Sequence, residues 1–250
     1  GALHADAGLQ RRSSSCCAWL CALLPPRPVS WLCATHVVCW ATVMCQGFFW
    51  TQFVGPETGI HLKVGAGGAA VLLRLAPLGM AAQALVATLA SGAIHSVNAQ
   101  VSGGAKAVYF ASEFGYMSFV LLAGALALWR PGDFTVQAIS TVLLALTGAV
   151  FAAHDSAPNI LLEQLDGVDD FEQRRGYYTG ALNASIGWGQ IVMSTFSGVV
   201  LWATHGSIAA LLVAGALAFG GVFAAVCAAD RCCGVMKLKQ KPLALRVLVE

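Results

Sequence analysis

The chain has 250 residues, of which 58% are hydrophobic and 10% are charged. Soluble globular domains carry about 25% charged residues, so this chain has too little charge to cover a surface that faces water. Its net charge of +2 excludes the general basic field that attracts nucleic acid. The composition therefore predicts an integral, multi-pass membrane protein with lipid, and not nucleic acid, as its surroundings.

The N-terminal segment, residues 1–27, contains the stretch LHADAGLQRRSSS and predicts a flexible linker. Pro25, Pro26 and Pro28 mark the start of the first long apolar run, because proline is tolerated in the first turn of a helix. The chain begins with Gly1 and not with methionine. We interpret this as a sign of a processed chain or of a fragment of a longer one.

Six apolar runs follow, and each is long enough for a helix of about 20 residues that crosses a bilayer. Glycine is abundant within them, which suits close packing between helices in lipid. We therefore expect an all-α fold with a six-helix membrane domain over residues 28–229 and a tail over residues 230–250. The expected spans are 28–53, 64–94, 105–129, 136–157, 176–203 and 207–228.

The basic residues predict the orientation of these spans, because lysine and arginine gather in cytosolic connections. Only Lys63 and Arg130 lie on one side of the predicted membrane. The other side includes both chain ends and predicts a cytosolic face. It holds Arg11, Arg12, Arg27, Lys106, Arg174, Arg175, Arg231, Lys237, Lys239, Lys241 and Arg246.

The fifth expected span carries a stripe of polar residues along one helical face. Asn183, Gly187, Gln190 and Ser194 follow the spacing of 3, 4, 7 and 11 that places residues on one side of a helix. Such a stripe does not suit lipid, because nothing there pairs with it. Two interpretations remain open: contacts between helices, or a face along which a hydroxyl-rich solute moves.

Two other spans carry polar residues at similar spacing. In the fourth, Ser140, Thr147 and His154 are seven residues apart, with Asp155 at the end that we expect to be cytosolic. Stripes on three of the six spans favour a shared interior cavity. The first span contributes Thr35, Thr42, Gln46 and Gln52.

Ionisable residues within spans are costly and usually functional. Glu113 lies about two turns into the third span, and Arg74 lies about ten residues into the second. The two could pair with each other, or each could face water or the membrane interface separately. His36 and His154 could relay protons, or each could simply be hydrogen-bonded within the bundle.

Five strings in order resemble motifs of one transporter family. They are FFWTQFVGPE at 48–57, LKVGAGG at 62–68, GAKAVYFAS at 104–112, GAVFAAHDSAPNILLEQL at 148–165 and RGYYTGALNASIGWGQIVMSTFSG at 175–198. Together they resemble the sucrose–proton symporters and the glycoside–pentoside–hexuronide branch of the major facilitator superfamily. The resemblance implies that the chain is the C-terminal six-helix half of a twelve-helix transporter that works by alternating access.

The resemblance also implies site residues and a membrane. A sugar similar to sucrose would bind to Asn183, Gln190, Ser194, Gln52 and Thr147, and a proton would be the coupling ion. The family's acidic pair is replaced by Trp50 and Gln52, so the coupling carboxylate would be Glu57, Glu113 or Asp155. Gly189 replaces a family proline and would keep a hinge. The expected location is the plasma membrane or an endosomal or vacuolar membrane.

Two other functional classes are compared with transport. A non-transporting half-length membrane partner, or a truncated and inactive transporter, is the alternative that the replaced acidic pair favours. An enzyme is not expected, because we find no paired histidine cluster, no G-x-S-x-G motif and no phosphate-binding loop. We expect no catalytic residue, no cofactor and no metal. The expected partners are lipid, a sugar and the N-terminal six-helix half.

Overall fold

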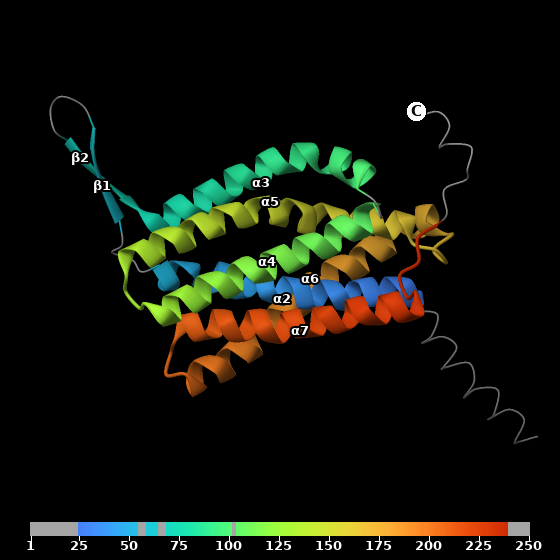
Figure 1. Ribbon diagram of the computed structural model, residues 1–250. Coiled ribbons are helices and arrows are strands. Elements are labelled where there is room, and N and C mark those ends of the chain that lie inside the picture. Colours follow the sequence, from blue (N-terminus) through green and yellow to red (C-terminus); the bar gives the residue numbers. More distant parts are fainter. Residues whose placement is uncertain (1–24, 55–58, 65–68, 102–103, 240–250) are drawn as a thin grey trace, which may run out of the picture.

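A computed structural model describes residues 25–54, 59–64, 69–101 and 104–239. Most of the predicted linker 1–27 and the last residues of the predicted tail lie outside the described residues. The elements run in the order α2 (Arg27–Val54), β1 (Gly59–Val64), β2 (Ala69–Arg74), α3 (Leu75–Gln100), α4 (Gly104–Trp129), α5 (Phe134–Gln164), α6 (Phe171–Ala203) and α7 (Ile208–Cys233) (Figure 1).

Six of the described helices are long and apolar enough to cross a membrane. They correspond in number and order to the six predicted spans, so the expected set of six helices with the length and apolar character to span a membrane is confirmed. The helices run alternately up and down the bundle (Figure 1). The starts of α2, α4 and α6 and the ends of α3, α5 and α7 therefore share one end, which we name the Arg27 end.

The start of the second predicted span, over residues 64–74, was wrong. Val64 ends β1 and residues 69–74 form β2. The two strands pair antiparallel, with Gly59 opposite Arg74 and Val64 opposite Ala69, and α3 begins only at Leu75. The cause is local: glycine is a poor helix former, and three of the four residues between the strands are glycine. Arg74 therefore lies at the exposed start of α3 and not inside a span.

The helices pack in a pattern that repeats after three helices. α3 packs along α5 as α2 packs along α6, α4 contacts α5 as α2 contacts α7, and α4 also contacts α7. Exchanging α2 with α5, α3 with α6 and α4 with α7 reproduces this set of contacts. Because three helices cross the bundle an odd number of times, the second unit begins at the end of the bundle opposite to where the first begins. Equivalent helices of the two units therefore run in opposite directions, which makes the units an inverted repeat.

A glycine lies at the closest approach in each of two equivalent helix pairs. A Cβ at Gly148 on α5 would lie 2.2 Å from the carbonyl oxygen of Gln83 on α3. A Cβ at Gly189 on α6 would lie 2.8 Å from Cβ of Trp40 on α2. Missing side chains thus let the backbones meet. The predicted hinge at Gly189 stays a prediction, but the structure gives this glycine a packing role. The non-helical residue within α6 is Arg174, not Gly189.

A polar clasp closes the Arg27 end of the bundle. Lys106 at the start of α4 forms an ion pair with the buried Asp230 near the end of α7. Nζ of Lys106 also donates to the Met236 carbonyl, at 2.8 Å, and the Met236 amide donates to Asp230 at 2.8 Å. The chain after α7 is therefore held against the bundle.

Replacing Gly148 with alanine should destabilise the bundle, because the added methyl group would overlap the α3 backbone. We expect a loss of about 1–3 kcal/mol in unfolding free energy, measured as a lower melting temperature in detergent. The matched control is Gly180→Ala on α6, where an added Cβ meets nothing within 4 Å. Equal melting temperatures for the two variants would contradict the close contact between α3 and α5.

Candidate functional site

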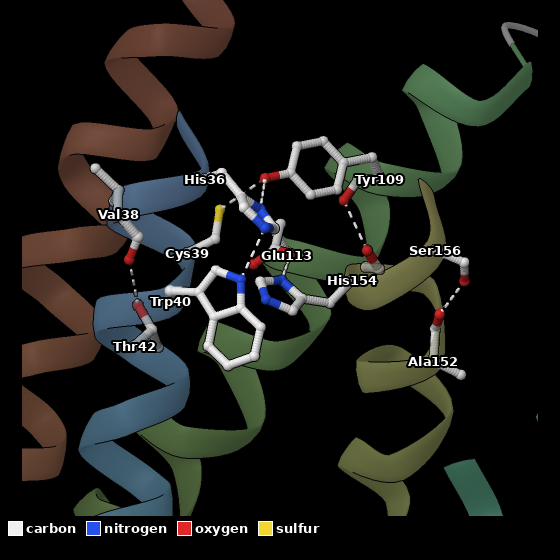
Figure 2. A network of polar contacts seen from close by, with 11 residues as sticks. His36, Val38, Cys39, Trp40, Thr42, Tyr109, Glu113, Ala152, His154 and Ser156 are labelled. Carbon is white, nitrogen blue, oxygen red and sulfur yellow. Dashed lines mark hydrogen bonds and ion pairs between the residues drawn. The ribbon is translucent and has the colours of Figure 1, made fainter. Parts of the chain in front are cut away.

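Three helices bring a cluster of polar side chains together inside the bundle (Figure 2). His36 lies nine residues after the start of α2, Glu113 nine residues after the start of α4, and His154 ten residues before the end of α5. At a rise of 1.5 Å per residue, all three lie about 13–15 Å from the Arg27 end. This depth corresponds to about the middle of a 30 Å hydrocarbon layer.

Glu113 and His154 form the central contact of the cluster. Nδ1 of His154 meets Oε1 of Glu113, and each side chain is only 1% exposed. Within the described part of the chain, Oε2 of Glu113 and Nε2 of His154 have no hydrogen-bond partner. The pair is electrically neutral as carboxylate and imidazolium, and it carries one negative charge after one proton leaves. Burial in an apolar bundle penalises that uncompensated charge.

The hydrogen bonds around His36 define its tautomer. Nε1–H of Trp40 donates to Nε2 of His36 at 2.7 Å, and an indole nitrogen can only donate. Nε2 of His36 must therefore be an acceptor, so the ring is neutral and carries its proton on Nδ1. That proton points to the Tyr109 hydroxyl at 3.2 Å, and the hydroxyl donates to Cys39 Sγ at 3.5 Å.

The two histidine rings stack face to face. Their centroids are 5.1 Å apart and their planes differ by 23°, so the N–H groups, which lie in the ring planes, point past each other. Trp40 also packs against the His154 ring, with centroids 4.9 Å apart. A proton on the Glu113–His154 pair therefore has no direct hydrogen-bonded path to His36, and the neutral His36 ring adds no second positive charge beside it.

The structure places Thr147, the predicted sugar ligand on α5, inside the bundle. Its hydroxyl accepts from Nε2 of Gln83 on α3 at 2.7 Å and donates to the Leu144 carbonyl. Gln46 and Thr42 from α2 and Ser140 from α5 are also buried. The polar stripe of the fourth predicted span therefore faces the interior, and so does that of the first span except for Gln52, which is exposed.

The stripe on the fifth predicted span does not join them. Asn183, Gln190 and Ser194 are exposed on α6, and the Ser194 hydroxyl donates back to the Gln190 carbonyl. The buried face of α6 carries Ser185 and Gly189 instead, because small residues allow α6 to approach α2. The prediction of an interior cavity shared by all three stripes was therefore wrong. Within the described residues, only two of the stripes point inward.

The other predicted site residues are dispersed. Gln52 is exposed near the end of α2, Asp155 is exposed beside His154, and Glu57 lies outside the described residues. Of the two alternatives left open for Glu113 and Arg74, the structure does not show the pair: Arg74 lies at the end of the bundle opposite the Arg27 end, while Glu113 contacts His154. Of the three predicted proton-coupling residues, only Glu113 is seen in a buried titratable pair.

Trp40, Tyr109 and Gln83 were not singled out from the sequence. The spacing held a signal for two of them, because Trp40 follows His36 by four residues and Tyr109 precedes Glu113 by four. Residues at that spacing share one face of a helix, so each belonged to a polar face already under consideration. Gln83 had no such signal, since its partner Thr147 is 64 residues away.

Among the residues that the structure describes, no group of three or more His, Cys, Asp or Glu side chains could hold a metal ion. The chemistry that the cluster supports is the uptake and release of one proton by a buried acid–imidazole pair. No family model matches the chain, and no curated protein or solved structure matches it. The arrangement of the side chains is therefore the basis for any functional conclusion.

The tautomer of His36 can be tested by ¹⁵N NMR of the chain in lipid. We expect Nδ1 to be protonated and Nε2 to be unprotonated, because Trp40 occupies Nε2 as a donor. Trp40→Phe removes that donor, so His36 should no longer favour the tautomer with its proton on Nδ1. The exposed His205 serves as an internal reference in both samples. A proton on Nε2 of His36 in the unchanged chain would contradict this geometry.

Proposed function

We propose that the chain is the C-terminal half of a secondary transporter of the major facilitator type, which moves a sugar together with protons by alternating access. The observation that carries the proposal is the Glu113–His154 pair, which is buried at mid-depth among helices that can cross a membrane. Ionisable groups at such positions usually mark ion pathways. An acid–imidazole pair suits protons in particular.

The pair has the property that coupling to alternating access requires. Its deprotonated form carries an uncompensated negative charge, which is favourable only where water reaches the pair. Proton release therefore depends on which conformation exposes the pair. Pro158 lies four residues after His154 within α5, so it donates no hydrogen bond to the His154 carbonyl and weakens the helix there.

The arrangement of the helices supports the same proposal. Inverted repeats of three helices occur within each half of major facilitator transporters, and the contacts between the six helices repeat in that way. α3 and α6 hold equivalent places in the two repeats and are the least buried of the six spans. The exposed amides of Asn183 and Gln190 need a polar partner in a membrane, and a second six-helix half would supply one.

The orientation belongs to the proposal as well. The excess of lysine and arginine at the Arg27 end would place that end, and with it both chain ends, in the cytosol. The plasma membrane and an endosomal or vacuolar membrane remain the proposed locations. In this orientation the polar clasp of Lys106 and Asp230 lies at the cytosolic face.

Uptake by proteoliposomes that contain the complete protein encoded by the gene tests this function. We expect sucrose, or another member of a panel of small sugars, to accumulate under an inward proton gradient. In Glu113→Gln the ratio of internal to external sugar should fall to about one, because equilibration no longer draws on the proton gradient. Glu163→Gln is the matched control, since Glu163 is an exposed carboxylate on α5.

Each outcome of the uptake assay has a definite meaning. Accumulation that Glu113→Gln abolishes and Glu163→Gln preserves would support proton-coupled sugar transport. Sugar uptake at the same rate and level with and without the proton gradient would identify the protein as a facilitator and contradict proton coupling. No uptake of any sugar in the panel would contradict sugar transport and favour the non-transporting membrane partner. The replacement of the family's acidic pair by Trp50 and Gln52 also favours that alternative.

A further inference from the structure

A cleft of about 490 Å³ opens between α2 and α3, away from the exposed polar stripe of α6. Gln46 lines it from α2 and Gln83 from α3, and Tyr116 and Phe151 contribute from α4 and α5. Sites for small molecules typically measure about 300–1,000 Å³, so the cleft has a suitable size. The remaining lining residues are small or apolar: Val43, Gly47, Met80, Ala84 and Ala87.

The two amides give the cleft specific hydrogen-bonding groups. Gln46 is only 4% exposed, and its Oε1 has no hydrogen-bond partner among the described residues. A buried carbonyl oxygen without a donor is costly. Oε1 is almost fully buried, so a ligand hydroxyl in the cleft would satisfy it after the Gln46 side chain turns toward the cleft. Gln83 is oriented by its hydrogen bond to Thr147, which leaves its second N–H and its oxygen for a ligand.

The chemistry of the lining defines the class of ligand. None of the lining residues that the structure describes is charged, so a carboxylate or an ammonium group would be desolvated there without compensation. The two amides suit hydroxyl groups, which both donate and accept. The aromatic rings and the aliphatic wall suit a flat apolar face, and an uncharged sugar ring or glycoside combines these features.

We propose that this cleft, and not the stripe on α6, contains the solute-binding groups of the chain, with Gln46 and Gln83 as the hydrogen-bonding pair for an uncharged glycoside. This rests on the proposed function in one respect, namely that the bound solute is the one transported. The position of the cleft fits that role. The Phe151 ring stacks on His154 with centroids 5.9 Å apart, so one residue that lines the cleft packs directly against the titratable pair.

Equilibrium binding to the chain in lipid nanodiscs tests the site without requiring transport. The probe is radiolabelled phenyl glucoside, compared with phenyl glucuronide, which differs by a carboxylate. We expect the glucoside to bind and the glucuronide to bind at least about tenfold more weakly. Gln46→Leu and Gln83→Leu should each weaken glucoside binding by about tenfold, as expected for one lost hydrogen bond.

Two further variants separate the cleft from the rest of the molecule. Met80→Trp fills the cleft from a side chain that is 44% exposed, so it should abolish glucoside binding without disturbing the core. Gln190→Leu makes the matched amide-to-leucine change on the outer face of α6 and should leave glucoside affinity unchanged. Melting temperatures measured in parallel identify any variant that has lost its fold. If Gln46→Leu or Gln83→Leu has done so, the effect of Met80→Trp on glucoside binding decides whether the cleft is the binding site.

Failure of the site and failure of transport give different results. Unchanged glucoside affinity in Met80→Trp, or no glucoside binding to the original chain, would overturn the cleft as the binding site. So would equal binding of the glucuronide, or weakening by Gln190→Leu alone. Binding that follows the cleft variants, combined with no uptake by proteoliposomes, would keep the site and contradict the transport function.

Discussion

The contact between Glu113 and His154 is the interaction on which the polar interior depends. Neither side chain can remain charged alone inside an apolar bundle, because the cost of desolvation is recovered only through a partner. Their meeting requires α4 and α5 to lie in one register, with both residues at the same depth. The hydrogen bond between His36 and Tyr109 then connects α2 to α4 at the same depth in the bundle. Together with the hydrogen bond from Trp40, it holds His36 as a neutral ring.

Close packing at two glycines determines which helix faces remain for other contacts. Gly148 brings α5 onto α3, and Gly189 brings α6 onto α2. Because these contacts use the small residues of α6, the amides of Asn183 and Gln190 are left on the outer surface. A polar surface of this kind is stable in a membrane only beside another polar surface, which connects the packing to the proposed second half.

The proposed solute cleft and the titratable pair share a wall. Phe151 lines the cleft and stacks on His154, while Tyr116 lines the cleft one turn after Glu113. A bound solute would therefore rest on the side chains that separate the pair from the cleft. This arrangement gives a physical route by which occupancy of one site could affect the access of water, and hence of protons, to the other.

The sequence by itself determined the number, order and approximate extent of the six spans, because a bilayer demands about 20 apolar residues for each crossing. It missed the paired strands at 59–64 and 69–74, because the apolar composition of residues 69–74 continues into the second span. The helical spacing also assigned Gln190 and Ser194 correctly to one face, as it did Thr147 and His154.

Only the tertiary structure decided which of those faces turned inward and which partner each polar group met. Arg74 and His154 were both chemically acceptable partners for Glu113, and helical spacing relates residues only within one helix. The choice between them depends on how α4 packs against α5 and on where α3 begins. Those contacts join residues far apart in the chain, so no local pattern contains them.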